Sequence, residues 1–121
     1  MAIIRYIVHD TEKTAEFYTK HLGFVLDESW GRAVAILSKG DLKLWLSGPQ
    51  ASASRPMSDG RAPEPGGWNR LVIEVDDIHA LAHTLKEAGI TFRNDIITGP
   101  GGSQVLVEDP AGNPIELFQP A

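Results

Sequence analysis

Apolar and polar residues follow one another along this chain in two patterns, one typical of β-strands and the other of α-helices. A mostly aliphatic and β-branched run over residues 2–8 predicts a strand. Residues 12–22 carry an apolar stripe at helical spacing and predict a helix, which Gly23 can end. Asp10 or Thr11 can cap the start of this helix. Glycine-containing turns then separate three further predicted strands, over residues 24–30, 33–38 and 42–47.

The same order of elements begins again at residue 68. Residues 68–75 predict a strand, and Asp77 can cap a helix over residues 78–88, which ends at Gly89. Three strands complete this half, over residues 91–98, 103–107 and 114–118. Two short segments occupy matching places in the two halves: Val8-His9-Asp10 matches Val75-Asp76-Asp77, and Leu22-Gly23-Phe24 matches Ala88-Gly89-Ile90. The sequence therefore predicts an internal duplication of a βαβββ unit of roughly fifty residues.

This duplication predicts an α+β fold in one domain, residues 1–121, built from two βαβββ modules. Module one spans residues 1–47 and module two spans residues 68–121. Residues 48–67 between them have no periodicity and are rich in serine, alanine, proline, glycine and arginine, which is typical of either a plain linker or a lid over a binding site. One helix covers only one face of each sheet. The two bare faces are therefore expected to come together as a partial barrel around a central cavity.

Composition excludes several classes of site and partner. The 121-residue chain has no cysteine, so it can form neither a disulfide nor a thiolate metal site. Its net charge of −5 and the lack of a basic cluster argue against nucleic acid as a partner. The first eight residues are too short for a signal peptide and include Arg5, and no stretch is long and apolar enough to enter a membrane. We expect a cytoplasmic protein.

The most informative stretch lies near the end of the chain, over residues 108–120. Pro110 and Gly112 predict a tight reversal, and the strand that follows places Glu116 and Phe118 on the face opposite its aliphatic residues. A carboxylate beside a phenyl ring on an inner sheet face is a candidate ligand site. A surface hairpin with an exposed glutamate is the alternative.

Three motifs are set within the βαβββ repeats: Phe17-Tyr18, Leu22-Gly23-Phe24 and the run from Asp109 to Leu117. With these motifs the chain resembles the vicinal oxygen chelate superfamily, which includes glyoxalase I, the extradiol dioxygenases and the bleomycin-type antibiotic-binding proteins. The resemblance extends over the whole chain except the central loop. It implies a homodimer, because chains of two such units commonly pair, but it does not specify an activity.

In the metal enzymes of that superfamily, the first and last strands of each unit supply the metal ligands. The matching positions here are Ile3 and Arg70, seven residues before Asp10 and Asp77, together with Trp45 and Glu116. An alternative register replaces Trp45 with Leu44. This set cannot hold a divalent cation, because such sites need about three or more nitrogen, oxygen or thiolate donors. We therefore expect no metal and no cofactor. Arg70 and Glu116 are expected to form an ion pair that is either structural or ligand-binding.

The histidines and tryptophans differ in what they predict. His79 and His83 have a zinc-compatible spacing, but they lie off the apolar stripe of their helix and are expected to be solvated. The aromatic residues instead predict a site for a flat, partly apolar ligand, unless two of the rings merely fill the core. The expected ligand-binding residues are Ile3, Trp30, Trp45, Trp68, Arg70, Glu116 and Phe118.

These residues favour a metal-free small-molecule binding protein. We expect it to sequester an aromatic or cationic natural product, with an antibiotic among the candidates, as bleomycin-type resistance proteins do. No residue is assigned a catalytic role. The alternative is a glyoxalase-like or dioxygenase-like enzyme, either dependent on a metal through unassigned ligands or metal-free with Glu116 as a general base.

Overall fold

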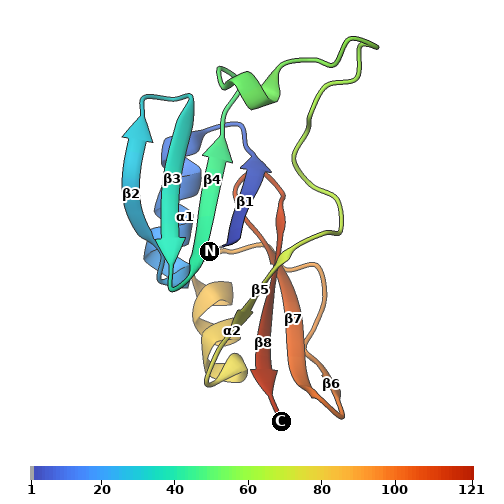
Figure 1. The fold of residues 1–121 in the computed structure, drawn as a ribbon. Coiled ribbons are helices and arrows are strands. Elements are labelled where there is room, and N and C mark those ends of the chain that lie inside the picture. The colour runs from blue at the N-terminus through green and yellow to red at the C-terminus, as the bar shows by residue number, and fades with distance from the viewer. Residues whose placement is uncertain (1) are drawn as a thin grey trace. The chain divides into compact units, whose positions relative to one another are not determined.

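The structure is a computed structural model that describes residues 2–121. Its chain divides into two compact units, Met1–Gly66 and Gly67–Ala121. Within the described residues there are two α-helices, eight strands and one 3₁₀ turn. The α+β class and the two βαβββ modules predicted from the sequence are therefore confirmed (Figure 1). The partial barrel and the central cavity between the modules stay predictions.

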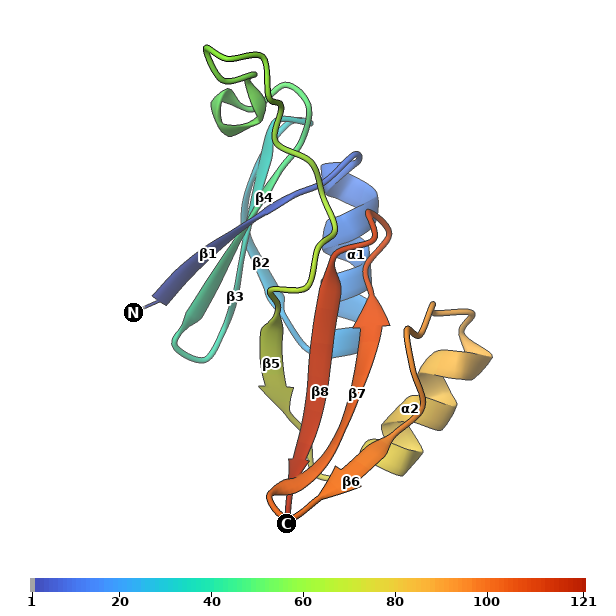
Figure 2. The same ribbon diagram turned by 90° about the vertical axis from the view of Figure 1, so that its right-hand side faces the viewer.

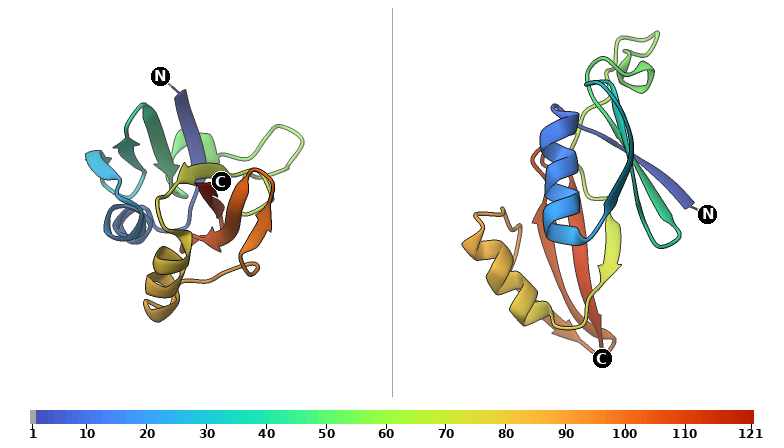
Figure 3. Two further views of the ribbon diagram at one scale, coloured as in Figure 1. Left: turned by 90° about the horizontal axis from the view of Figure 1, so that it is seen from below. Right: turned by 90° about the vertical axis from the view of Figure 1, so that its left-hand side faces the viewer.

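The first unit holds one mixed sheet in the order β1-β4-β3-β2. Strand β1 pairs with β4 in parallel, and the other two pairings are antiparallel. Helix α1 lies along one face of this sheet, over Leu37, Leu44 and Leu46, whose side chains are fully buried (Figure 3). The elements of this unit are β1 (Ala2–Ile7), α1 (Thr11–Leu22), β2 (Val25–Trp30), β3 (Val34–Lys39), β4 (Leu42–Ser47) and the 3₁₀ turn η1 (Ser52–Ser54).

The second unit repeats this topology with the order β5-β8-β7-β6 (Figure 2). Strands β5 and β8 are parallel, and β7 is antiparallel to both of its neighbours. Its core includes Ile78 and Leu85 of α2 and the alternate residues Ile115 and Leu117 of β8, all buried. The elements are β5 (Leu71–Glu74), α2 (Ile78–Glu87), β6 (Ile97–Gly99), β7 (Gly102–Glu108) and β8 (Pro114–Pro120).

The predicted helix ends are confirmed in both units. The Asp10 carboxylate accepts a hydrogen bond from the Lys13 backbone N–H at 3.0 Å, so Asp10 is the cap and Thr11 is the first helical residue. Asp77 accepts from the Ala80 N–H at 3.0 Å in the same way. Gly23 ends α1 in the left-handed conformation, with φ of 74°, which a residue without a Cβ adopts without strain.

Two of the predicted strands are shorter in the structure. The strand expected over residues 68–75 begins only at Leu71. The strand expected over residues 91–98 is largely absent, because only residues 97–99 are strand and Phe92 makes an isolated bridge to Val107. Asn94 explains the second difference. Its side-chain Oδ1 accepts from the Leu106 N–H at 2.9 Å, and so takes the place of a backbone carbonyl of a neighbouring strand.

The segment at residues 48–67 is not structureless. Its start is held by hydrogen bonds from the Gly48 N–H to the Ala33 carbonyl (2.8 Å) and from the Ser54 hydroxyl to the Gly48 carbonyl (2.7 Å). Further along, the Met57 N–H donates to the Arg61 carbonyl at 2.7 Å and closes a second turn. The choice between a linker and a lid stays open.

The structure also bears on the histidines, on metal binding and on membrane-spanning helices. His79 and His83 are exposed, as expected, and His83 lies 3.0 Å from the Glu87 carboxylate. Across residues 2–121, no group of three or more histidine or acidic side chains is placed to hold a metal ion. Neither α1 nor α2 is long and apolar enough to cross a membrane.

Candidate functional site

The candidate site occupies the face of the second sheet that α2 leaves bare. Alternation along β5 and β8 separates the two faces: Leu71 and Leu117 are buried on the helix side, and the residues between them point to the other side. Val72 pairs with Glu116 across these two parallel strands, and Glu116 pairs with Leu106 of β7. The bare face therefore has a carboxylate at its centre.

Arg70 and Glu116 form the ion pair predicted from the sequence. Arg70 donates from Nε at 3.1 Å and from Nη2 at 2.8 Å, and both bonds end on Oε1 of Glu116. The side chains are 29% and 11% exposed, respectively, so the pair is only partly screened by water. Arg70 Nη1 also donates to the Trp68 carbonyl at 3.2 Å. One guanidinium thus ties the last residues before β5 to the middle of β8.

The second carboxylate oxygen of Glu116 is left for another partner. No donor within residues 2–121 binds Oε2, and this atom is accessible to solvent rather than buried without a partner. Because the two N–H groups bound to Oε1 fix the direction of the carboxylate, Oε2 is a directed acceptor for an N–H or O–H group of a ligand.

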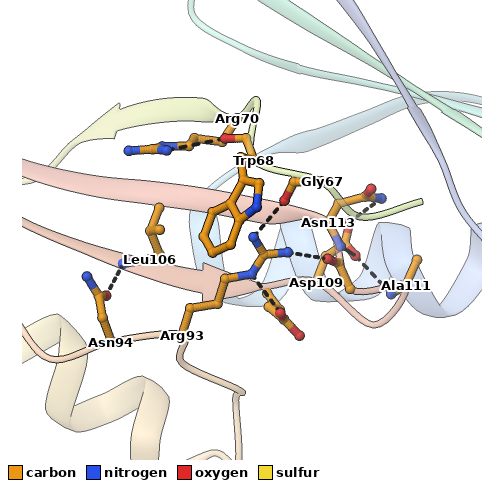
Figure 4. Close-up of polar contacts among 11 residues, drawn as sticks. Gly67, Trp68, Arg70, Arg93, Asn94, Leu106, Asp109, Ala111 and Asn113 are labelled. Atoms are coloured by element: carbon orange, nitrogen blue, oxygen red, sulfur yellow. Dashed lines mark hydrogen bonds and ion pairs between the residues drawn. The ribbon is translucent and has the colours of Figure 1, made fainter. Parts of the chain in front are cut away.

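A second cluster, which we call the Arg93 cluster, adjoins this pair and consists of Arg93, Glu108, Trp68, Gly67 and Gly112. Arg93 Nε donates to Glu108 at 2.7 Å, Nη1 to the Gly67 carbonyl at 2.6 Å and Nη2 to the Gly112 carbonyl at 3.0 Å. Its guanidinium carbon lies 4.8 Å from the centre of the Trp68 ring (Figure 4). The sequence analysis did not identify Arg93.

The reversal before β8 is built by Asp109, a buried residue. Its Oδ1 accepts from the backbone N–H groups of Ala111 (2.8 Å) and Asn113 (3.0 Å), and its Oδ2 accepts from the Asn113 side chain at 3.2 Å. These bonds close the turn that the Asp109–Asn113 sequence predicts. They set where β8 starts, and therefore where Glu116 lies.

In the first unit, Trp45 and Ile3 lie on the face opposite α1. Leu44 is fully buried on the helix side, and Arg5 pairs with Trp45 as Val72 pairs with Glu116. Trp45 is therefore the register counterpart of Glu116, and the alternative register with Leu44 is wrong. The Arg5 guanidinium lies 5.0 Å from the Trp45 ring centre, and its Nη1 donates to the Ser47 hydroxyl at 2.9 Å.

The other expected site residues belong to different units, Trp30 to the first and Phe118 to the second. Trp30, at the end of the edge strand β2, is 67% exposed, and its Nε1 donates to Glu28 at 3.4 Å. Phe118 pairs with Glu74 and Gln104, two residues beyond Glu116 on the same face. The structure thus brings Arg70 into contact with Glu116 and Trp68. A common site for these residues with Ile3, Trp30 and Trp45 stays a prediction.

The residues at the positions expected for metal ligands do not fit a divalent cation. Ile3 has no donor atom, Trp45 offers only an N–H, and Arg70 places its positive charge against the single carboxylate of Glu116. We therefore derive no chemical step through a metal at these four positions.

One protein-family model matches nearly the whole sequence. The model that describes the Glyoxalase/Bleomycin resistance protein/Dioxygenase superfamily matches residues 1–117. It therefore includes both βαβββ units and the segment between them.

Individual proteins similar to this chain have different recorded roles. A probable lactoylglutathione lyase from Vibrio cholerae serotype O1 is 29% identical over 119 residues, which cover 93% of this chain and 84% of the relative. TnmS3, an antibiotic binding protein from Streptomyces sp. CB03234, is 29% identical with a TM-score of 0.74, over 98% of this chain and 93% of that one. A superfamily member from Sphaerobacter thermophilus is 28% identical with a TM-score of 0.75, over 98% and 95% of the two chains.

Proposed function

Since the chain belongs to the Glyoxalase/Bleomycin resistance protein/Dioxygenase superfamily, we propose that it is a small-molecule binding protein that sequesters a flat aromatic or cationic natural product without transforming it. An antibiotic is one such ligand. This proposal rests on one observation: two N–H groups of Arg70 donate to the same oxygen of Glu116, which leaves the other oxygen for a ligand. The pair offers a hydrogen-bond acceptor whose direction is fixed by the arginine.

The surroundings of Glu116 also support binding rather than catalysis. General acid–base catalysis needs a side chain placed to give a proton to, or take one from, the reacting group. Within the described residues, the only side chain that hydrogen-bonds to Glu116 is Arg70, a permanently charged group that does not exchange protons at neutral pH. The similarity to an antibiotic binding protein at 29% identity agrees with a binding role.

The alternative function is an enzyme of the same superfamily, with Glu116 as the base or with a metal held elsewhere. The specific observation in its favour is the 29% identity to a probable lactoylglutathione lyase. Because the two functions differ in whether the ligand is converted, one pair of measurements separates them.

The first measurement is formation of S-lactoylglutathione from methylglyoxal and glutathione, followed by the gain of thioester absorbance with and without added Ni²⁺ or Zn²⁺. We expect no formation above the protein-free rate. The second is binding of two bicyclic aromatic probes, neutral 2-naphthol and cationic N-methylquinolinium, followed at the tryptophan indole N–H signals by NMR. We expect saturable binding of at least one probe, weakened at least about fivefold by Glu116→Gln. Glu87→Gln on the exposed side of α2 is the control and should bind normally. Measurable turnover, or no binding of either probe, contradicts the proposal.

We also propose a homodimer in the cytoplasm. Light scattering on the purified protein would show the dimer as a mass twice that of the chain. A monomer mass at micromolar concentration would contradict it.

A further inference from the structure

Arg93 contacts four groups of the second unit, although it belongs to neither a helix nor a strand. Its side chain is 16% exposed, and all three of its guanidinium nitrogens donate hydrogen bonds. Two of the acceptors are backbone carbonyls from separate loops, that of Gly67 before β5 and that of Gly112 before β8. Arg93 therefore holds the segment that leads into β5 against the reversal that leads into β8.

Trp68 owes its place to these contacts. The residue is 69% exposed, so packing by a hydrophobic core does not hold it. Instead, the Arg93 guanidinium lies against one face of the indole ring, the preceding carbonyl of Gly67 is bound by Arg93, and the carbonyl of Trp68 itself is bound by Arg70 (Figure 4). One ring face is thus covered by a cation and the other is left for a ligand.

A tryptophan with a cation on one face discriminates between ligands on its other face. Both faces of the indole ring attract cations, and Arg93 occupies one of them. A cationic ring stacked on the free face would lie opposite the guanidinium and be repelled through the indole. At an effective dielectric constant of about 20, two unit charges roughly 9 Å apart disfavour binding by an order of magnitude. A neutral ring is not repelled by the guanidinium and still gains the stacking interaction with the indole.

We infer that Arg93 is a positioning residue that fixes Trp68 as a one-sided stacking platform and makes this site select neutral planar aromatic ligands over cationic ones. The inference rests on the proposed binding function and narrows its ligand class. Glu108, which accepts a hydrogen bond from Arg93 Nε, offsets part of the cation's charge. Removing the cation and removing this carboxylate should therefore change the selectivity in opposite directions.

The test uses the full chain and the two bicyclic probes, 2-naphthol and N-methylquinolinium, which have nearly the same shape and differ in charge. Each is titrated against ¹⁵N-labelled protein, and the dissociation constant is read at the Trp68 indole N–H, assigned with Trp68→Phe. The wild-type protein should bind 2-naphthol at least about fivefold more tightly. Arg93→Met, which keeps an apolar stem without the charge, should lower this ratio at least about fivefold. Glu108→Gln should raise it.

The ratio of the two constants is informative because a loss of packing would weaken both probes together. If neither probe moves any tryptophan indole signal, both the selectivity and the proposed function are overturned. If a probe binds without moving the Trp68 signal, only the selectivity is overturned. If both bind and the ratio is unchanged in Arg93→Met and Glu108→Gln, the role of Arg93 is overturned and the binding function stands. A wild-type preference for the cation also overturns the role of Arg93. If Arg93→Met does not fold, as its amide spectrum would show, the direction of change in Glu108→Gln decides.

Discussion

At the level of single residues, the two arginines of the bare sheet face have separate roles. Arg70 joins the Glu116 carboxylate of β8 to the Trp68 carbonyl just before β5, and Arg93 joins two carbonyls on segments outside the strands. Both use the planar, forked guanidinium, which a lysine ammonium cannot reproduce. The geometry of the candidate site therefore depends on side-chain cations as much as on the sheet.

The Arg70→Met variant tests how much the ion pair contributes to stability. It leaves the largely buried Glu116 carboxylate without its partner, and we expect the free energy of unfolding to fall by about 1–3 kcal/mol, less than for a fully buried pair because Arg70 is 29% exposed. Urea denaturation measures this change. Arg55→Met, at an exposed position, should alter stability by less than about 0.5 kcal/mol. Equal effects of the two variants would show that the pair is not structural.

Only part of the site could be predicted from the sequence, because some of its residues have a fixed place in the repeated pattern and others depend on partners far away in the sequence. Arg70 and Glu116 could be found because each has a fixed place in a repeated βαβββ pattern. Arg93 could not, since its carbonyl partners lie 26 and 19 positions away and any residue type supplies a carbonyl. The contact between Arg5 and Trp45 was missed for a related reason, because it joins strands that are parallel neighbours and distant in sequence.

At the level of elements, the exit from β4 is a close backbone contact that allows no side chain. A Cβ at Gly48 would lie 2.5 Å from the Arg32 carbonyl oxygen and 3.1 Å from Cγ2 of Thr11. The Gly48 N–H meanwhile donates to the Ala33 carbonyl. The segment after β4 can therefore leave the sheet in this direction only with glycine at position 48.

Gly48→Ala should lower the free energy of unfolding by about 1–3 kcal/mol, because the methyl group meets backbone rather than a movable side chain. Gly99→Ala is the matched control: nothing lies within 4 Å of its added Cβ, and we expect a change below about 0.5 kcal/mol. Thermal or urea unfolding of the two variants gives the comparison. A Gly48→Ala protein as stable as the control would mean that the chain leaves β4 by a different path.

Elements with strong local signals were predicted well, and those that depend on distant partners were not. Both helices begin at aspartate caps and carry clear apolar stripes, and their predicted ends agree with the structure to within one residue. The segment at residues 91–98 has β-rich composition, but Asn94 and Arg93 satisfy Leu106 without forming a full ladder. Composition alone does not show whether a sheet edge will be available for such a segment.

At the level of the whole molecule, the chain is a pair of units with the same order of strands and different surfaces. Both sheets place their first and last strands side by side and in parallel. The register counterparts differ, however: tryptophan in the first unit and glutamate in the second. The duplication fixed the architecture, and the candidate chemistry arose from substitutions on the bare faces.

Limited trypsin digestion should first cut the chain after Arg61, in the segment at residues 48–67 that follows the first sheet. The side chain of Arg61 is 83% exposed, whereas those of Arg70 and Arg93 are 29% and 16% exposed. Arg55 is also exposed but precedes Pro56, which blocks the protease. Mass spectrometry should show fragments 1–61 and 62–121. Arg61→Gln should slow the first cut and Arg55→Gln should not; a first cut within a sheet would contradict the division into units.

The repeated Asp-capped helix has a practical consequence. Asp10 and Asp77 make the same hydrogen bond at the same distance, in units of the same topology. Any perturbation applied to one can be compared with its counterpart in the same sample, under identical solvent and temperature. The effect of a change at one cap can therefore be measured against the unchanged cap of the other helix in the same protein.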